Sequence, residues 1–559
     1  MQKTCANTWC GQSFEITSAD LVFYDKVSPR FCGKKYAIPP PLICPACRFQ
    51  ERIVWRPELH LFQRKSDLSG EITLSKYPPE APCTVYSSEE WMSDRWDGLS
   101  YGRDFDFSRP FFDQFAELLR EAPLNALSVS GNENSDYVNS ASWCKNCYLL
   151  SGANNNEDCY YGNFVNYCRL CVDCNFVDHC ELCYECVDCA KCYNLRYSQQ
   201  CSNCSDSSFL FGCRGCKSCF GSVNLANREY VFLNEQLSKE QYQERIRGLQ
   251  LDRRSRVEEA RAFFHAHRLK YPHKFMIGEM NEDVSGNGIL RSRRAHECFD
   301  VSDIEDCSYC SWFHQAKSCM DCYAWGFPVE ECYSCMEVGR DSHSVLFSCL
   351  TYNGTNITYC YSCREGSRDV FGCVSLKRKS YCVFNKQYSK EEYEKIVADI
   401  IEHMQRTGEW GKFFPASICP LAYNQTIAQD YFPLTSAQAR SLGARWAEEP
   451  SVVYPPSVEI ISDSASDIPV DICDTVLKCT ATGKPFKIIP QELRFYQLQG
   501  IPLPDKCFTA RHQVRLLKRN PRKLWDRTCG KCGKGIKTSY SPERPETVYC
   551  ERCYLETVY

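Results

Sequence analysis

A three-residue repeat of small residues runs through the centre of the chain. Sixteen cysteines between residues 144 and 219 stand at positions that are all multiples of three. Tyr, Phe, Val and Asn crowd the same stretch, proline is absent, and helix-forming residues are sparse. This pattern predicts short strands in a parallel β-helix, in which each coil buries its interior against the next.

A longer interval predicts how these coils stack. Cys147, Cys168 and Cys189 are evenly spaced, each twenty-one positions after the one before, and other cysteines repeat at the same interval. We therefore expect coils of about twenty residues with these thiols on neighbouring coils, about 4.8 Å apart. Buried free thiols are the favoured interpretation, because a narrow interior needs small side chains. Disulfides, and metal or iron–sulfur binding, remain alternatives.

The cysteine-rich stretch is duplicated. Residues 220–242 match residues 371–393 at a constant offset of 151, and four cysteines of the first copy fall on cysteines of the second at that offset. The second copy has fewer cysteines, and their three-residue phase breaks after Cys322. In each copy a capping-box sequence predicts a helix, starting at Ser238 and at Ser389, that covers the open end of the coils.

Other helices are predicted outside the repeats. Residues 108–119 predict an amphipathic helix, because Ser-Arg-Pro at its N-terminal end is followed by apolar residues at helical spacing. Residues 252–271 predict a charged helix, and residues 435–448 predict a helix in a connector rich in proline and aromatic residues.

The N-terminal segment contains two cysteine pairs, Cys5 with Cys10 and Cys44 with Cys47. Four thiolates on two tight turns are a typical tetrahedral zinc site, and Gly11 suits the positive φ of the first turn. With its Gly-x-x-Phe, Phe-Tyr and Cys-Pro-x-Cys-Arg sequences, the segment 3–52 resembles the zinc-ribbon (treble-clef) family. It departs from that pattern in the four-residue spacing of the first pair and in a spare Cys32.

The C-terminal segment has the spacing of a structural zinc site. Its ligands are expected to be Cys529, Cys532, Cys550 and Cys553. All four are thiols, which favours a contribution to folding over catalysis. The chain is therefore expected to hold two structural Zn²⁺ ions.

A degenerate copy of the N-terminal segment precedes this tail. When the N-terminal segment is shifted by 472, Gly11 falls on Gly483, but Cys10 corresponds to Thr482, and after a shorter loop Cys47 corresponds to Ala510. Two lost ligands favour a metal-free relic. Whether other residues form a third metal site is left open, the candidates being Cys473, Cys479, Cys507 and His512.

Nearly the full length resembles bacterial cysteine-rich proteins that join a treble-clef N-terminus, the segment 96–112, paired solenoids and a four-cysteine tail. That resemblance implies this architecture and zinc, and it implies no activity. The fold class expected is mainly β and multidomain, with two short parallel β-solenoid modules capped by helices and flanked by treble-clef or zinc-ribbon domains. The boundaries expected are 1–65 (treble clef), 66–136 (connector), 137–236 (first solenoid), 237–296 (helical cap and linker), 297–388 (second solenoid), 389–470 (helical cap and connector), 471–522 (degenerate treble clef) and 523–559 (zinc ribbon).

Composition narrows the class of protein. The chain has 559 residues, 42 cysteines, and 66 basic against 70 acidic residues. No apolar run is long enough for a membrane span, and the N-terminus lacks a secretory signal, so a cytoplasmic protein with reduced cysteines is expected. Residues 505–545 hold twelve Lys or Arg against three acids. This basic segment is a candidate for phosphate contacts through Arg511, Arg515, Lys518, Arg519, Arg522 and Lys523.

The function expected is a zinc-binding scaffold or recognition protein. Its partner would be nucleic acid, through the basic segment, or another protein, with self-association left open and no membrane contact. No catalytic motif is found, so an enzyme is not expected. The alternative is a metal- or polysaccharide-linked enzyme that uses the solenoid face.

Overall fold

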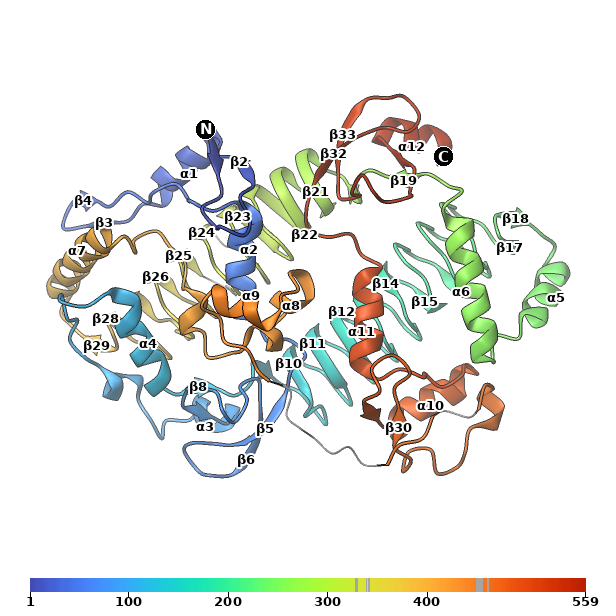
Figure 1. The fold of residues 1–559 in the computed structure, drawn as a ribbon, viewed down its shortest axis with the longest axis horizontal. Coiled ribbons are helices and arrows are strands. Elements are labelled where there is room, and N and C mark those ends of the chain that lie inside the picture. Colours follow the sequence, from blue (N-terminus) through green and yellow to red (C-terminus); the bar gives the residue numbers. More distant parts are fainter. Residues whose placement is uncertain (327–329, 338, 340–341, 449–455, 460–461, 559) are drawn as a thin grey trace.

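Two stacks of coiled chain dominate the molecule (Figure 1). The computed structural model describes residues 1–326, 330–337, 339, 342–448, 456–459 and 462–558. Strand residues outnumber helical residues, 30% against 24%, so the protein is mainly β with several separate small sheets. None of the described helices combines the length and the apolarity that a membrane crossing requires.

The first stack is built from parallel strands. Strands on neighbouring coils pair at an interval of twelve residues, as when Val138 pairs with Leu150, and isolated bridges continue this interval to Phe232. Its strands are β9 (Val129–Ser130), β10 (Val138–Ser142), β11 (Tyr148–Asn154), β12 (Tyr160–Asn166), β13 (Asn175–Asp178), β14 (Val187–Ala190), β15 (Tyr193–Arg196) and β16 (Ser205–Ser208).

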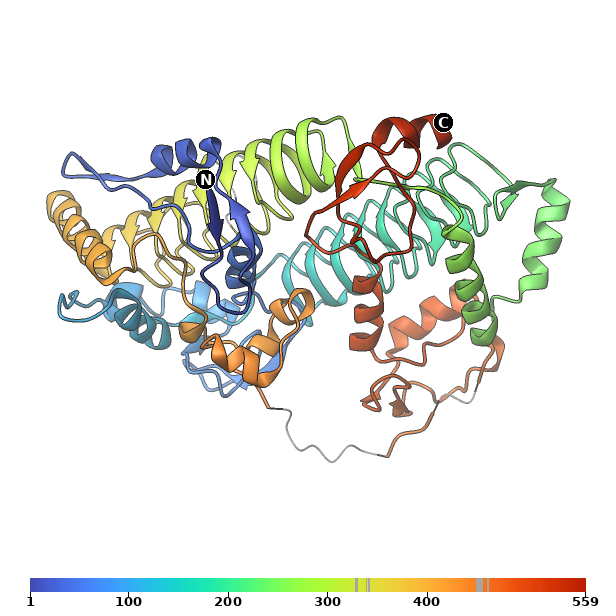
Figure 2. The ribbon, with the colours of Figure 1, turned by 45° about the horizontal axis from the view of Figure 1, so that its top comes forward.

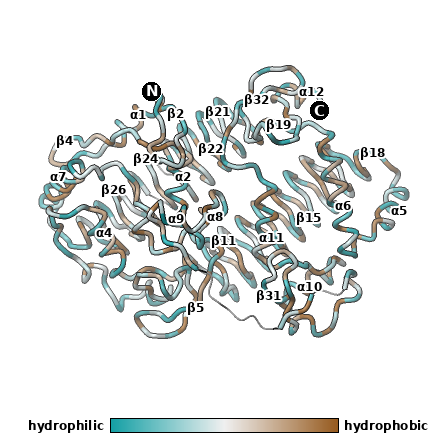
Figure 3. Tube along the Cα trace, in the orientation of Figure 1, coloured by the Kyte–Doolittle hydropathy of each residue, from teal (hydrophilic) through white to brown (hydrophobic). Residues whose placement is uncertain are grey.

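Each coil consists of four three-residue sides. The residue before each interior position has a positive φ, as at Asp173 (55°) before Cys174 and Asp188 (55°) before Cys189. This left-handed conformation turns the chain at every corner, and the corner N–H donates to the preceding coil, as from Asp173 to the Tyr160 carbonyl. Hydrophobic and hydrophilic segments consequently alternate along the coils (Figure 3).

The predicted stacking at every twenty-first residue is wrong. The coils advance by twelve residues, so Cys147 is followed on the next two coils by Cys159 and Cys171, while Cys168 and Cys189 lie on other sides. Both intervals are multiples of three. Cysteines that recur every third residue therefore look aligned at either interval, and only the strand pairing reveals the coil length.

The second stack repeats this design with three longer coils. Strand pairing steps by thirteen residues from Lys317 to Glu330 to His343, and again from Thr355 to Arg368. These single-residue insertions explain the broken cysteine phase. The strands are β20 (Gly278–Glu279), β21 (Glu282–Leu290), β22 (Arg293–Ser308), β23 (His314–Met320), β24 (Glu330–Tyr333), β25 (His343–Leu346), β26 (Thr355–Thr358), β27 (Arg368–Phe371), β28 (Ser380–Val383) and β29 (Lys386–Gln387).

The insertions also refine the offset between the two copies. Asp173 lies four coils before Gly221, and Asp321 lies four coils before Gly372, but three of the latter coils are one residue longer. The two stacks therefore match at an offset of 148 before the insertions and 151 after them. A constant offset of 151 therefore places the cysteines before the insertions one side out of register, and the error goes unnoticed because adjacent sides carry the same residue type.

Interior thiols fill both stacks as buried hydrogen-bond donors. The Cys174 Sγ lies 3.4 Å from the Val172 carbonyl and 3.5 Å from the Cys183 carbonyl, and the other coils repeat this pattern. The Ser198 hydroxyl donates in the same way, over 2.8 Å, to the carbonyl two residues earlier. Cysteine and serine are thus interchangeable in hydrogen bonding here, and cysteine is the more readily buried of the two.

Helices close both stacks, and the two predicted starts are confirmed. Ser238 and Ser389 each form a complete capping box, with Gln241 and Glu392 respectively. The predicted helices at 108–119 and 252–271 are present as α4 (Phe111–Glu121) and α6 (Arg254–Arg268). The helix predicted at 435–448 is present as the shorter α9 (Ser436–Ser441), because Gly443 ends it with a φ of 75°. The helices are α1 (Ser18–Val27), α2 (Pro45–Ile53), α3 (Ser88–Met92), α4 (Phe111–Glu121), α5 (Lys239–Leu249), α6 (Arg254–Arg268), α7 (Lys390–Thr407), α8 (Ala428–Tyr431), α9 (Ser436–Ser441), α10 (Pro490–Gln499), α11 (Phe508–Leu517) and α12 (Glu551–Val558).

The stacks meet near their starts and run in opposite directions (Figure 2). The Phe164 ring of the first lies 4.0 Å, centre to centre, from the Trp312 ring of the second. The N-terminal segment lies on the second stack, and α11 lies on the first (Figure 1). The remaining strands are short: β1 (Gln2–Thr4), β2 (Ser13–Glu15), β3 (Arg30–Phe31), β4 (Lys34–Lys35), β5 (Phe62–Lys65), β6 (Ile72–Ser75), β7 (Val85–Tyr86), β8 (Leu124–Asn125), β17 (Val231–Phe232), β18 (Glu235–Gln236), β19 (His273–Lys274), β30 (Leu477–Lys478), β31 (Pro485–Phe486), β32 (Trp525–Thr528), β33 (Gly535–Thr538) and β34 (Val548–Tyr549).

Candidate metal centres

The N-terminal cysteines converge from a turn and a helix start. Cys5 and Cys10 belong to the turn between β1 and β2, where Gly11 has the expected positive φ of 57°. Cys44 is the N-cap of α2, and Cys47 lies in its first turn. All four sulfurs lie within 4.8 Å of one another and could hold a metal ion.

The C-terminal cysteines repeat this geometry. Cys529 and Cys532 stand in the turn between β32 and β33, and Cys550 and Cys553 stand at the start of α12. Their sulfurs also lie within 4.8 Å of one another. In both groups the backbone N–H at the helix start, on Cys44 or Cys550, donates to the first sulfur over 3.3 Å.

The sulfur spacings fit a tetrahedral ion. Four sulfurs at about 2.3 Å from zinc lie about 3.8 Å from one another. The structure has 3.7 Å for Cys5 to Cys47, 3.7 Å for Cys10 to Cys44 and 3.8 Å for Cys532 to Cys550. The donor set therefore fits a four-coordinate ion that prefers soft ligands, with no further ligand needed.

Hydrogen bonds favour thiolates in both groups. The Cys47 thiol, outweighing the opposing effect of burial, lowers the pKa of Cys44 to about 5. At Cys529 burial raises the pKa, but backbone N–H donors from Cys550 and Cys532 outweigh it and bring the pKa to about 6. One thiol of each group is thus ionised at neutral pH, which is the form that binds metal.

The degenerate copy retains the turn and has lost half of the ligands. Gly483 has a φ of 70° after Thr482, and Cys507 is the N-cap of α11, as Cys44 is of α2. The Thr482 hydroxyl lies 3.8 Å from the Cys507 sulfur, where Cys10 meets Cys44 in the intact group. Cys479 therefore has only Cys507 as a second thiol in this frame. Among the described residues, no third group of potential ligands comes together here.

The interior cysteines of the stacks differ from these ligand groups. Burial raises the pKa of Cys174, Cys189 and Cys201 well above the ordinary value of a thiol, whereas hydrogen bonds from neighbouring thiols lower the pKa of Cys147 to about 4 and that of Cys168 to about 5. None of the 42 cysteines forms a disulfide. Within the described ranges, only the two terminal groups bring three or more ligand atoms within 4.8 Å of one another. The geometry of the sulfurs, and not the protonation of the thiols, therefore separates the interior cysteines from the two terminal groups.

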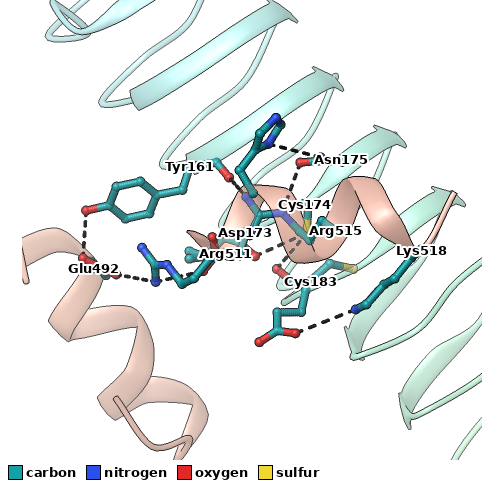
Figure 4. A network of polar contacts seen from close by, with 12 residues as sticks. Tyr161, Asp173, Cys174, Asn175, Cys183, Glu492, Arg511, Arg515 and Lys518 are labelled. Carbon is teal, nitrogen blue, oxygen red and sulfur yellow. Dashed lines mark hydrogen bonds and ion pairs between the residues drawn. The ribbon is translucent and has the colours of Figure 1, made fainter. Parts of the chain in front are cut away.

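The part of the basic segment that carries Arg511, Arg515 and Lys518 lies against the first stack (Figure 4), whereas Lys523, Lys531, Lys534 and Lys537 are exposed. Asp173, at a buried corner of the first stack, accepts from Arg515 Nη1 over 2.6 Å and lies 2.9 Å from Arg511 Nη1. Arg511 also donates to Glu492 over 3.0 Å. Both arginines are buried, at 8% and 1% exposure, so the expectation that they present charge to phosphate is wrong for these two residues.

The remaining four predicted phosphate contacts, Lys518, Arg519, Arg522 and Lys523, follow the end of α11 at Leu517. They therefore do not lie on one face of that helix. Arg519 pairs with Asp188 of the first stack over 2.9 Å and with Asp300 of the second. Arg522 pairs with Asp300 over 3.0 Å, and its side chain is 5% exposed. Lys518 lies 3.8 Å from Glu185, and Lys523 alone of the six predicted residues is exposed. The arginines of the segment thus join the two stacks.

The N-terminal unit docks in the same way. In α2, Arg48 donates to Asp321 over 2.7 Å, and Arg52 lies 3.4 Å from the same carboxylate. Asp321 is the corner of the second stack that corresponds to Asp173 of the first. Sequence reasoning missed both aspartates. Each aspartate lies four coils before a corresponding glycine, Gly221 or Gly372, but three of the coils before Gly372 are one residue longer, so no constant sequence offset aligns both pairs.

Comparisons with known proteins add little. No family model matches the chain, and no curated protein matches it. A crystal structure of a protein described as an acetyltransferase, from Desulfovibrio desulfuricans G20, is 7% identical and has a TM-score of 0.11, covering 50% of this chain and 81% of its own. At this score the likeness supports no conclusion about fold or activity.

Proposed function

We propose that this protein is a zinc-stabilised scaffold with two structural Zn²⁺ sites. The observation that supports it most directly is the spacing of 3.7 to 3.8 Å between paired sulfurs in both terminal groups. Each group would use its four thiolates as ligands, which closes the coordination shell and leaves no position for a catalytic water. Zinc would then supply folding energy at both ends of the chain. The C-terminal group has only a small core of its own, whereas the N-terminal group belongs to a large core that it shares with the second stack.

In this proposal the two coil stacks are β-solenoid modules and the end units are treble clefs. The constant parallel register from coil to coil and the ladders of interior thiols support the first part. The turn, hairpin and helix start shared by all three cysteine-bearing units support the second. The helices α2 and α11 would then each anchor to a solenoid through two arginines and one buried aspartate. In this way the N-terminal unit and the degenerate copy would be fixed to the second and the first solenoid, respectively.

A protein partner suits this scaffold better than nucleic acid. Most of the cationic groups suggested for phosphate are already paired with carboxylates of the stacks. Rigid solenoids instead offer long regular rows of side chains to another protein. An enzyme that uses the solenoid face remains the alternative, and it would be favoured if metal were found bound to the interior thiols.

Elemental analysis of anaerobically purified protein tests the proposal. We expect two zinc ions per chain, one of which is lost in Cys47→Ser and the other in Cys553→Ser. Cys186→Ser is the matched control, since this interior thiol would bind no metal, and it should keep both ions. Iron as the main metal, or a ratio of four or more, would instead favour the metal-enzyme alternative.

A further inference from the structure

A cavity of about 370 Å³ lies where the two stacks meet the connector that precedes them. Hydroxyl side chains from the connector and the first stack dominate one wall; they belong to Ser88, Ser128, Ser130, Ser140 and Ser142. Aromatic side chains of the second stack line the opposite wall; they belong to Trp312, Trp325 and Tyr352. The volume and the position between modules are typical of sites for small ligands.

Several polar groups of this lining have no partner inside the protein. Asn125 is 5% exposed, and its Oδ1 accepts from the Ser88 hydroxyl over 2.9 Å. The Nδ2 of Asn125 and the hydroxyl of Ser142, a residue 9% exposed, have no hydrogen-bond partner among the described residues, yet neither atom is enclosed. An unpaired atom that stays accessible on a buried lining residue faces the cavity, so a ligand can reach it. The exposed side chains of Ser130 and Asn353 add further unpaired groups to the lining.

Charged groups around the cavity balance one another. The cations and the carboxylates near it are equal in number, namely Arg56, Lys76 and Arg364 against Glu58, Glu337 and Glu365. Glu337 accepts from Arg56, and the Nε and Nη2 atoms of Arg364 are enclosed. The groups that a ligand can reach are therefore mainly neutral hydroxyls and amides beside aromatic rings, which favours a neutral, polar ligand.

We propose that this cavity binds a neutral mono- or disaccharide. A sugar hydroxyl both donates and accepts, so it pairs with the Asn125 amide and with the serine hydroxyls alike. The C–H face of a sugar ring lies on the aromatic surface of Trp325 and Tyr352, because the π faces carry partial negative charge. An apolar ligand would displace water from the unpaired Asn125 and Ser142 groups without replacing its hydrogen bonds, which costs free energy.

Calorimetric titration of the full-length protein with cellobiose, maltose, lactose and N,N′-diacetylchitobiose tests the proposal. The sugar that binds most tightly is then compared with its fully O-methylated derivative, which keeps the rings and has no hydroxyl donor. We expect the derivative to bind at least about tenfold more weakly.

A conservative variant tests one of the unpaired groups. Ser142→Ala removes a cavity hydroxyl and breaks no hydrogen bond within the described residues, so it should weaken sugar binding about two- to tenfold. Ser202→Ala is the matched control, because Ser202 lies further along the same side of the first stack and outside the cavity. The neighbouring coil already has Ala190 at this position, so the control should keep full affinity.

A blocking variant tests the place of binding. Ser130 is exposed at the lining, so Ser130→Trp should fill the cavity at little cost in stability and abolish sugar binding. The zinc content should not change, so a failure of this proposal is distinguishable from a failure of the zinc proposal. Equal affinity for the sugar and its methylated derivative, equal affinity of Ser142→Ala and Ser202→Ala, undiminished binding by Ser130→Trp, or no binding of any of the four sugars at millimolar concentration would overturn the proposal.

Discussion

The intact N-terminal cysteine group and its degenerate copy have the same arrangement of turn and helix but differ in the number of thiols that could stabilise it. Both have a glycine turn, a cysteine N-cap and a helix whose arginines meet a buried aspartate. The first has four thiols in reach of one another, whereas the second has threonine and alanine at two of these positions. Docking through arginine and aspartate is therefore separable from the four-thiol group, and the copy relies on this docking and on its apolar core.

The largest effect is expected from metal removal. If zinc supplies the folding energy of the two terminal groups, on the order of 10 kcal/mol or more, a chelator should unfold them. Hydrogen exchange should then accelerate in α2 and α12 while α11 keeps its protection. Equal loss of protection in α11 would contradict the separation of docking from metal binding.

The next effect concerns the buried aspartates. Asp173→Asn leaves Arg511 and Arg515 without their shared charge, and Asp321→Asn does the same to Arg48 and Arg52. Breaking a buried pair on one side costs about 3–5 kcal/mol, which denaturant unfolding can measure.

Both aspartate variants should keep two zinc ions. Asp206→Asn is the matched control, because Asp206 is a corner residue with a φ of 48° that is exposed, and it should change stability little. If Asp173→Asn also left the free energy of unfolding unchanged, the pairing of Arg511 and Arg515 with Asp173 would not be needed for stability. Phosphate binding by these two arginines would then regain support.

A smaller effect is expected from acid. Burial, together with the nearby Arg515 charge, lowers the pKa of His512 to about 3, below the ordinary value of 6.5. Between pH 6.5 and 3 the unfolded chain therefore binds a proton at His512 that the folded chain does not bind. The contribution of His512 to the free energy of unfolding is complete above pH 6.5 and is lost as the pH falls toward 3.

The difference is on the order of 1–4 kcal/mol at the acid end. His512→Gln should flatten the pH dependence of unfolding relative to the parent protein, while any effect of acid on the cysteine groups is common to both. Identical pH profiles would show that His512 is not held neutral.

The sequence predicted local features better than long-range ones. Capping boxes at Ser238 and Ser389, the glycine turns and the two ligand groups depend on residues close together or on familiar spacing. The coil length did not follow, because a cysteine at every third position is compatible with the observed short coil as well as with the longer predicted one. The carboxylates that pair with the basic segment also could not be predicted from the sequence, because Asp300 is 219 residues from Arg519 along the chain. Clustered charge along the chain does not reveal whether its counter-charge lies on another module.

The central claim is that four thiols, and not the shared frame of glycine turn and helix start, determine where metal binds. The most direct test is the zinc content of Thr482→Cys/Ala510→Cys measured beside the parent protein, since these changes restore the two lost ligands next to Cys479 and Cys507. The account predicts a rise from two zinc ions per chain to three. An unchanged ratio of two in a folded variant, or a ratio of three already in the parent protein, would contradict it.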